Sequence, residues 1–376
     1  MKVFIALTIL TSILLLLSSG QNVSASSENG ATGVQNRKAL YSGVQMDVID
    51  IHFHPSKGWE QLGPLGREFI QKELPQWIPA PLKTFSLKVA SSLINAPYGL
   101  FGIKNECTSS GIAFCGLFAT YAPETWGVVD NDYISEILAD DRNSPGSLGK
   151  PIFFGLASID INNWEETKKE KLRDLEATVA NTLFKGIKMA HIHNNVPLSM
   201  AGYDGIYEIA RKYALPVYHH IGSTPIRSLD DFDTEAEKLH YVKSYDPEEL
   251  DFLIQSYPDV TFILGHMGFD FNKEGYDFTD ESIAMAKSYD NVYLEISALG
   301  RPAFDEDGKF LDYAFARFAA EGIVEKIIYG SDGPVYPGAT KAYLNSVLRS
   351  MERNDYSYLD AQKVLFHNAN NIFRIY

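Results

Sequence analysis

The sequence predicts an α/β chain folded as a (β/α)8 TIM barrel, and three observations support this fold class. Short apolar runs alternate with longer segments of helical periodicity, as parallel βαβ units require. Several runs end directly at a histidine or an aspartate, and a barrel brings the carboxyl ends of its strands to one face. The turn after the first run, "HFHPSKGWE", lacks the glycine-rich phosphate loop of an open dinucleotide-binding sheet. A closed barrel is therefore expected, since it also buries every strand.

Eight strands follow one another along the chain, separated by helical segments. A long insertion, residues 56–110, separates the first strand from the second, and we expect it to lie over the active-site face. The expected strands are 48–53, 112–120, 152–159, 186–190, 216–220, 260–265, 292–296 and 327–329. The expected helices are 164–183, 203–213, 247–257, 281–289 and 311–321, with a final helix pair across 341–376.

The first 25 residues have the order of a secretory signal peptide. One lysine precedes an apolar run at 3–17, and small residues lead to an expected cleavage site after Ala25, with Gly20 as a second option. The run has about 15 residues, short of the roughly 20 that span a bilayer. We therefore expect an exported protein, periplasmic or secreted, with no stable membrane span after cleavage. Residues 26–44 are expected to form a flexible lead-in, and 45–376 the barrel domain.

Composition limits the classes of partner. The chain has a formal net charge of −15 and no basic run, which argues against nucleic acid. Hydrophobic residues make up 45% of the chain, enough for a large core. The two cysteines, Cys107 and Cys115, could form a disulfide in an oxidising compartment, or Cys115 could be a buried thiol within an apolar run. The sequence leaves both alternatives open.

The first strand ends with two histidines one residue apart, His52 and His54, in "DVIDIHFHP". In a strand, residues i and i+2 point to the same side, so the two imidazoles face together at the end where barrel enzymes keep their chemistry. One such pair can share a metal ion. Alone it is weak evidence, because ordinary surface or core histidines are more common.

Later strands strengthen the metal interpretation. "PVYHHIG" ends with His219 and His220, "FILGHMG" contains His266, and "IIYGSDGP" contains Asp332. Each places a nitrogen or oxygen ligand where an apolar run stops. Three or more histidines with one aspartate suit a divalent metal ion, Zn²⁺ first and Mn²⁺ or Fe²⁺ as alternatives.

Five motifs together resemble the amidohydrolase superfamily: "IDIHFHP", "PVYHHIG", "ILGHMG", "IIYGSDGP" and "VLFHNANNIFRI". They are most similar to the branch that holds metal-dependent hydrolases and decarboxylases related to aminocarboxymuconate-semialdehyde decarboxylase. The resemblance covers residues 45–376 in outline, but the insertion matches nothing. It implies one divalent metal held by His52, His54, His220 and Asp332.

The same resemblance implies roles for individual residues. Asp332 would also accept a proton from metal-activated water, and His266 would polarise the substrate, move a proton or, in two-metal relatives, bind metal. His219 is expected to face away from the metal. Lys188, in "GIKM", would bridge a second metal only if it were carboxylated; otherwise it is a basic substrate-binding or structural residue.

Other polar candidates have two interpretations each. Arg301 could bind a substrate carboxylate or form a loop salt bridge. Glu295 could support a metal ligand or pair inside the barrel wall. His191 and His193 could line the pocket, although loop histidines are more often surface residues. Trp59 and Trp77 could wall an apolar pocket or simply pack in a core.

The predicted function is hydrolysis of a small-molecule amide, lactone or ester by metal-activated water. The alternative is nonoxidative decarboxylation of an aromatic or unsaturated acid, and a second alternative is an inactive barrel that serves as a binding protein. Export favours hydrolysis, since decarboxylases of this branch serve intracellular catabolism. The expected partner is a small-molecule substrate, and the resemblance adds a homodimer as an expectation.

Overall fold

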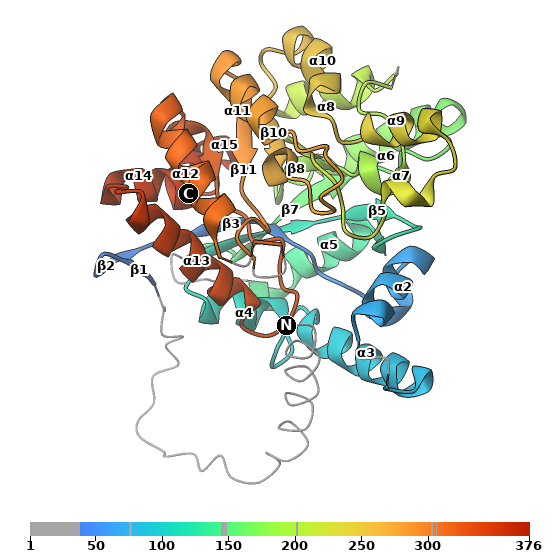
Figure 1. Cartoon of the computed structure of the whole chain (residues 1–376), viewed down its shortest axis with the longest axis horizontal. Helices are drawn as coiled ribbons and strands as arrows, with labels where there is room; N and C mark the ends of the chain where they lie inside the picture. Colours follow the sequence, from blue (N-terminus) through green and yellow to red (C-terminus); the bar gives the residue numbers. More distant parts are fainter. Residues whose placement is uncertain (1–37, 75–76, 144–148, 201, 302–303, 306) are drawn as a thin grey trace.

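The computed structural model describes residues 38–376 except 75–76, 144–148, 201, 302–303 and 306. Its centre is a parallel eight-stranded sheet in which neighbours in the sequence are neighbours in the sheet, in the order β3-β4-β7-β8-β9-β10-β11-β12 (Figure 1). The strands are β3 (Ile49–Phe53), β4 (Phe114–Phe118), β7 (Phe153–Ser158), β8 (Phe184–Met189), β9 (Val217–His220), β10 (Phe262–Gly265), β11 (Val292–Glu295) and β12 (Ile327–Ile328).

The sheet closes where the chain just beyond β12 returns to β3. Ile51 donates its N–H to the carbonyl of Tyr329 at 3.3 Å. His54 donates to the carbonyl of Gly333 at 2.8 Å, and Gly333 donates to the carbonyl of His52 at 3.3 Å. All eight expected strands are thus present in a nearly closed barrel, and the predicted fold class is confirmed.

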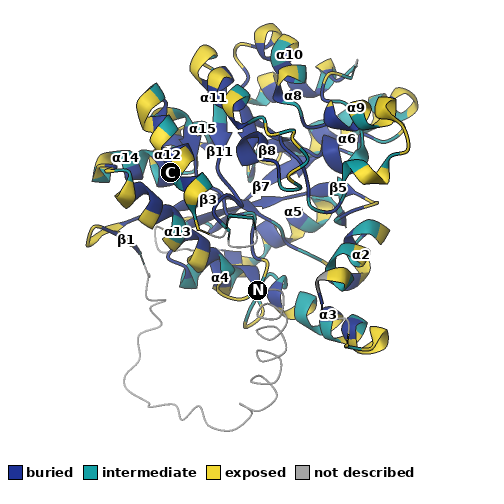
Figure 2. Cartoon of the chain, in the orientation of Figure 1, coloured by how far each residue is buried: buried dark blue, intermediate teal, exposed yellow. Residues whose placement is uncertain are grey.

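Helices surround the barrel because each carries one apolar face. In α8, for example, Ile206, Tyr207, Ile209 and Ala210 are buried while the charged residues face outward. Figure 2 shows the strands dark blue inside and the outer helical faces yellow. The longer surrounding helices are α5 (Asn131–Ala139), α6 (Trp164–Val179), α8 (Asp204–Tyr213), α9 (Glu235–Val242), α10 (Asp251–Ser256), α11 (Thr279–Ser288), α12 (Lys309–Glu321) and α13 (Ala339–Arg353).

Two cores lie on the two sides of the sheet. The larger one fills the space between the strands and the helices. The smaller one fills the barrel with Ile51, Phe118, Tyr218, Ile263 and their neighbours. Phe118 and Tyr218 form the upper layer of this interior and contact the His52 ring at centroid distances of 4.3 and 5.1 Å. The apolar barrel interior therefore ends directly beneath the histidines of the first strand.

The amino-terminal region differs from the expectation in part. The predicted signal peptide lies outside the described residues. The expected lead-in, 26–44, ends in an ordered antiparallel hairpin of β1 (Ala39–Tyr41) and β2 (Val44–Met46), which corrects that boundary. Tyr41 holds the hairpin in place, since it is 1% exposed and donates to the carbonyl of Tyr356 at 2.6 Å.

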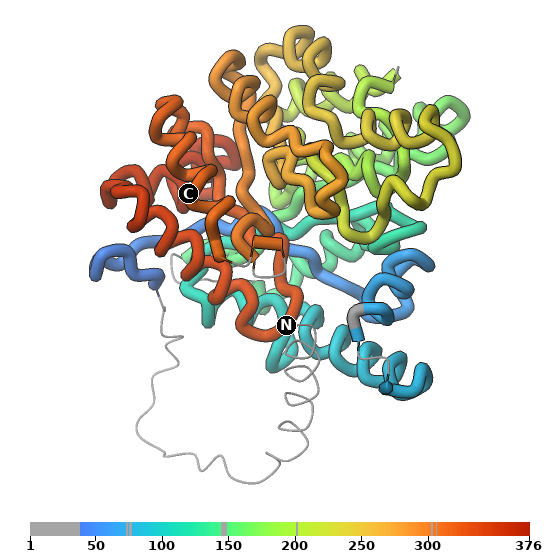
Figure 3. Tube along the Cα trace, in the orientation of Figure 1, coloured from blue at the N-terminus to red at the C-terminus, as the bar shows by residue number. Residues whose placement is uncertain are grey.

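The insertion contains η1 (Trp59–Gln61), α2 (Pro64–Glu73), α3 (Ala80–Ile94) and α4 (Ile103–Ser109). Its first part reaches the loop after β4, where Gly63 and Leu65 donate to the carbonyls of Thr125 and Glu124. In the tube view, α3 lies at the edge of the molecule, away from the barrel (Figure 3). Among the described residues, no helix is long and apolar enough to cross a membrane.

Cys107 in α4 and Cys115 in β4 are joined by a disulfide, so the first of the two sequence alternatives is the one the structure shows. Both residues are fully buried. Next to the bond, the Glu106 carboxylate accepts N–H groups of Gly338 at 2.9 Å and Thr340 at 3.0 Å, at the start of α13. The end of the insertion is thus attached to the barrel wall and to α13.

Candidate functional site

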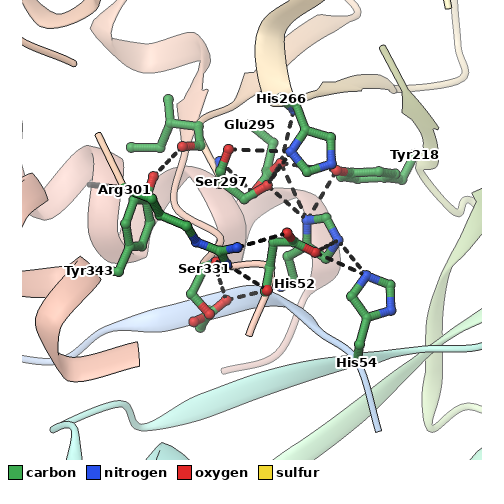
Figure 4. Close-up of polar contacts among 12 residues, drawn as sticks. His52, His54, Tyr218, His266, Glu295, Ser297, Arg301, Ser331 and Tyr343 are labelled. Atoms are coloured by element: carbon green, nitrogen blue, oxygen red, sulfur yellow. Dashed lines mark hydrogen bonds and ion pairs between the residues drawn. The ribbon is translucent and has the colours of Figure 1, made fainter. Parts of the chain in front are cut away.

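Three side chains from opposite ends of the chain form a compact group at the mouth of the barrel. His52 Nε2 lies 2.9 Å from His54 Nε2, and these atoms lie 3.5 and 3.3 Å from Asp332 Oδ1 (Figure 4). One ligand atom from each residue lies within 4.8 Å of the others, close enough to share one metal ion. His52 is buried, whereas His54 and Asp332 are 34% and 27% exposed, so a small molecule can approach from the open side.

The local backbone explains why these residues meet. A register shift in β3 between Asp50 and Phe53 spans His52. The buried Asp50 carboxylate then joins both ends of the chain, because its Oδ1 accepts the N–H of His52 at 3.0 Å and of Ser331 at 2.9 Å. Asp50 thereby holds the backbone of His52 and that of Ser331, the residue directly before Asp332.

A buried network holds His52 from behind. Its Nδ1 lies 3.1 Å from Ser297 Oγ, 3.1 Å from Tyr218 Oη and 3.5 Å from Glu295 Oε2. Glu295 accepts from both hydroxyls, Ser297 at 2.8 Å and Tyr218 at 3.0 Å. Of the two interpretations of Glu295, the structure supports the one in which Glu295 supports a candidate metal ligand, here His52. This network leaves His52 Nε2 directed at the mouth, and burial lowers the pKa of His52 well below its usual value.

His266 is oriented by the same serine. Its Nδ1 lies 2.9 Å from Ser297 Oγ and 3.3 Å from the Ser297 carbonyl. A carbonyl only accepts, so Nδ1 carries the proton and Nε2 keeps a free lone pair. Burial lowers the pKa of His266 to about 4. Near neutral pH this histidine is uncharged, and its free nitrogen can accept a proton or bind a metal.

Arg301 contacts the aspartate. Its Nη1 lies 3.3 Å from Asp332 Oδ2, and its Nη2 donates to the carbonyl oxygens of Ser331 and Asp332. Of the two interpretations of Arg301, the structure thus shows the salt bridge. The same guanidinium is therefore already occupied and does not await a substrate carboxylate. Burial alone would raise the pKa of Asp332, but Arg301, His54 and His52 together hold it well below its usual range. Asp332 is therefore an ionised carboxylate at the mouth.

His220 lies beside the three-residue group, outside its 4.8 Å limit. Its ring centroid is 4.4 Å from that of His266 and 5.0 Å from that of His193. Among the described residues, nothing forms a hydrogen bond with His220 Nε2, although the atom is buried. A buried imidazole nitrogen without a partner is costly unless a ligand satisfies it, and a metal ion fits that need. The residue next to it, His219, faces the opposite side and stacks on Phe262, as expected.

Lys188 is buried beneath the mouth, between two aromatic rings. Its Nζ lies 4.2 Å from the centroid of Tyr218 and 4.8 Å from that of Phe118. Burial lowers the pKa of Lys188 to about 7. The amine is thus close to the histidines, and its carboxylation stays a prediction.

Several backbone positions at the mouth are strained. His266, Met267, Ala298 and Asp332 have φ angles of 59°, 56°, 63° and 52°, in the left-handed region that non-glycine residues rarely adopt. They follow β10, β11 and β12. Strain of this kind concentrates at functional sites, where the surrounding packing maintains it.

A cavity of about 430 Å³ lies beside the site, and none of His52, His54, His220, His266 and Asp332 lines it. His193, which is 4% exposed, belongs to its wall and links it to His220. Arg227 also lines it, and among the described residues no carboxylate lies within ion-pair distance of this guanidinium. The other lining residues are Leu65, Glu124, Asn162, Asn194, Asn195, Asp231 and Phe232.

The structure decides several alternatives for single residues. His191 and His193 are buried, 0% and 4% exposed, so the surface interpretation is wrong for both, while His193 lines the cavity as the other interpretation expected. Trp59 packs in a small core of the insertion as expected, but Trp77 is 73% exposed and walls no pocket. Sequence reasoning missed Ser297 and Tyr218. Tyr218 lies two residues before His220 on β9 and so shares its face, a signal that could have identified it, whereas Ser297 lies in the turn after β11.

The fold and the site define a class: a (β/α)8 barrel with a candidate His-His-Asp metal centre at the carboxyl ends of its strands. Residues 150–375, more than half of the chain, match the family model described as amidohydrolase. The chain therefore belongs to this amidohydrolase family, whose members are metal-dependent. The match includes His220, His266 and Asp332 and begins after His52 and His54. No curated protein sequence matches the chain.

Solved structures share the fold at low identity. A TIM-barrel protein from Bordetella bronchiseptica superposes with a TM-score of 0.54 at 15% identity, covering 88% of this chain and 99% of the other. The 5-carboxyvanillate decarboxylase of Sphingomonas paucimobilis gives 0.53 at 14%, with 88% and 99% covered. A probable 2-pyrone-4,6-dicarboxylic acid hydrolase of Acinetobacter baumannii gives 0.52 at 14%, with 88% and 100% covered. Both hydrolases and decarboxylases adopt this fold, so the fold alone leaves the reaction open.

Proposed function

We propose that this chain is a metal-dependent hydrolase of a small-molecule amide, lactone or ester. The observation that carries the proposal is the ionised Asp332 carboxylate, which lies within 3.5 Å of two imidazole nitrogens and is 27% exposed at the barrel mouth. Hydrolysis needs a group that takes a proton from water beside the scissile carbonyl. Asp332 has the charge, the position and the solvent access for this task.

The residues present fit a divalent cation. Two imidazoles and a carboxylate form a donor set that suits zinc, with manganese and iron(II) as alternatives, and the unpartnered His220 Nε2 supplies a third nitrogen, and so a fourth donor, beside them. Such an ion, when bound, would polarise the substrate carbonyl and lower the pKa of water. Arg301 holds Asp332 in place, and the Ser297–Glu295 pair holds His52 and His266.

We assign His266 the role of an acceptor. Its Nδ1–H is donated to Ser297, so its free Nε2 can take a proton or bind the ion. With a pKa of about 4, it is a poor donor near neutral pH. This refines the sequence expectation, in which His266 moved a proton in either direction.

Decarboxylation is the second candidate, and one observation favours it. Arg227 lines the cavity without an ion-pair partner among the described residues, and a guanidinium in that position can hold a substrate carboxylate. The same contact would also serve a hydrolase of an acidic lactone. The two reactions differ in product, because hydrolysis adds water and decarboxylation releases CO2.

The test is a substrate panel with the metal-loaded protein and one variant. Lactones, N-acyl amides and aryl or unsaturated carboxylic acids are incubated with the protein, and acid and CO2 release are measured. Asp332→Asn should lower kcat at least ~100-fold while circular dichroism stays unchanged, because the amide neither accepts the proton nor matches Arg301. The exposed Asp307→Asn is the control. Full activity of Asp332→Asn, or no turnover of any compound, would contradict the proposal.

Export stays part of the proposal. The Cys107–Cys115 disulfide supports it, because such bonds persist in oxidising compartments. A fractionation experiment with the full chain, in which the amino terminus of the mature protein is sequenced, tests both export and cleavage after Ala25. A protein that stays in the cytoplasm with Met1 intact would contradict both.

A further inference from the structure

Helix α3 of the insertion is apolar on two sides, and the rest of the described chain covers only one. Leu87 packs with Trp59 and Leu74 in the small core of the insertion. On the other side, Leu82, Phe85, Val89 and Leu93 follow a spacing of three to four residues and so share a face, called here the outer face of α3. Leu82 is 56% exposed and Phe85 is 66% exposed.

The apolar exposure is concentrated in this part of the chain. Of the thirteen exposed large hydrophobic residues among those described, five fall within residues 77–100. Trp77 and Leu100, each 73% exposed, flank α3 on its two ends in the sequence. The remaining eight are distributed over separate elements. Single exposed apolar residues are normal, whereas a contiguous group indicates an interaction surface.

Charge identifies the kind of partner. Residues 74–105 carry three lysines and no aspartate or glutamate, and this is the longest acid-free stretch of a chain with a net charge of −15. None of the three lysines is free: Lys83 donates to carbonyls of the insertion, Lys88 pairs with Glu60, and Lys104 donates to the Arg142 carbonyl. The surface is therefore apolar and nearly uncharged, without the acidic residues that a phosphate layer would repel.

We propose that the outer face of α3, with Trp77 and Leu100, docks onto the surface of a phospholipid bilayer. A helix that exposes leucine and phenylalanine on one face can bury that face at the boundary between headgroups and acyl chains, which tryptophan also favours. Figure 1 shows α3 at the periphery, where a flat surface can reach it. A second copy of the chain fits less well, because two molecules of charge −15 repel each other.

The test is sedimentation of the full chain with phosphatidylcholine vesicles, with and without one-fifth phosphatidylglycerol. The protein should sediment with both vesicle types and should remain bound in high salt, because apolar burial drives the contact. The Leu82→Ser/Phe85→Ser double variant should bind the vesicles at least roughly tenfold more weakly than the wild type. Phe252→Ser, which removes a 75% exposed phenylalanine from α10, should bind as the wild type does. All variants keep residues 1–37, so any contribution of the amino-terminal run cancels.

Two further measurements separate the outcomes. Tryptophan emission should shift to the blue on vesicles, and Trp77→Phe should abolish that shift, since Trp59 and Trp164 are already buried and the partly buried Trp126 lies outside residues 77–100. Light scattering without lipid gives the oligomeric state. The proposal is overturned by protein that stays in the supernatant, by binding that disappears in high salt, or by an equal loss in Phe252→Ser. A dimer that the double variant dissociates, with no vesicle binding, would assign the face to a second copy.

Discussion

At the scale of single residues, the site combines neutral imidazoles with one ionised carboxylate. Burial keeps His52 and His266 uncharged by lowering the pKa of each ring, and their Nδ1 atoms both meet one serine hydroxyl, Ser297 Oγ. Ser297 donates its single proton to Glu295, so it can only accept from the two rings. One small side chain therefore fixes the orientation of two histidines through their Nδ1 atoms and leaves both Nε2 atoms outside this network.

Replacing this serine should weaken the site without unfolding the protein. In Ser297→Ala, both Nδ1 atoms lose an acceptor, and we expect metal affinity or kcat to fall about 10–100-fold. The matched control is Ser282→Ala, which removes a fully buried serine hydroxyl on α11 that has no hydrogen-bond partner among the described residues. Isothermal titration with Zn²⁺ and steady-state kinetics report the two effects. Equal behaviour of the two variants would show that Ser297 does not position the histidines.

Lys188 should make stability depend on pH. Its pKa is about 7 in the folded protein and 10.5 for an unperturbed lysine, so between these values the unfolded chain binds the extra proton. The native state thus gains stability as pH rises from 7 to 10.5 and loses it as pH falls. Lys188→Met should be more stable than the wild type at pH 7, by about 4 kcal/mol at most, and the difference should shrink as the pH approaches the unperturbed pKa of roughly 10.5.

Urea unfolding of the metal-free protein at several pH values between neutrality and the unperturbed lysine pKa measures this difference. The exposed Lys341→Met serves as the control, because it removes a lysine without removing a buried amine. A stability difference for Lys188→Met that is the same at every pH would contradict the linkage.

The sequence predicted the metal-type residues better than their surroundings. Strand periodicity paired His52 with His54, and the expected barrel, which brings the carboxyl ends of its strands to one face, added Asp332 to them. Arg301 and Ser297 could not be assigned in this way, because their partners depend on side-chain directions in loops that have no period. His191 and His193 were misjudged for the same reason: a short helix, α7 (His191–Asn194), turns both inward.

At the scale of elements, the predictions succeeded where the hydrophobic residues follow a clear pattern over the length of a strand or helix. Strands β4 and β7, for example, are continuous apolar runs that are buried along their length, which is typical of parallel sheets. The β1–β2 hairpin has only three residues in each strand and lies next to a polar segment, so its pattern is too short to be predicted from the sequence. Helix α3 follows Pro79 and includes Pro81, and its second apolar face obscured any single helical stripe.

The disulfide should stabilise the contact between the insertion and the barrel. It joins residues eight apart in the sequence, in α4 and β4, and for a loop of this size the chain-entropy relation gives about 2–3 kcal/mol. The free energy of unfolding of the Cys107→Ser/Cys115→Ser variant should therefore be lower by that amount, and the variant should unfold at a lower urea concentration. Limited proteolysis should cut first within residues 80–102 if α4 detaches. An unchanged midpoint would show that packing of α4 against α13 is sufficient without the bond.

At the scale of the whole molecule, the candidate metal centre lies where the barrel closes. His52 lies in β3, the first strand of the barrel, and His54 follows it directly. Asp332 follows β12, the last strand, 278 residues further along the chain than His54. The closure itself is short, since β12 has two residues and the contacts near the mouth are the pair between Gly333 and the backbone of His52 and His54. A metal ion held by residues from both sides would therefore link the two ends of the fold.

Metal removal should consequently destabilise the entire barrel. A ligand that binds only the native state at about 100 times its dissociation constant adds about 2.7 kcal/mol to the free energy of unfolding. Zn²⁺ should raise the melting temperature of the chelator-treated protein, and the shift should disappear in His54→Gln, while His240→Gln, an exposed histidine on α9, should keep it. Hydrogen exchange should locate the gain, because the amides of His54 and Gly333 bridge the closure and should become more protected than those of β7 and β8. A Zn²⁺-dependent shift that survives in His54→Gln would place the ion elsewhere in the molecule.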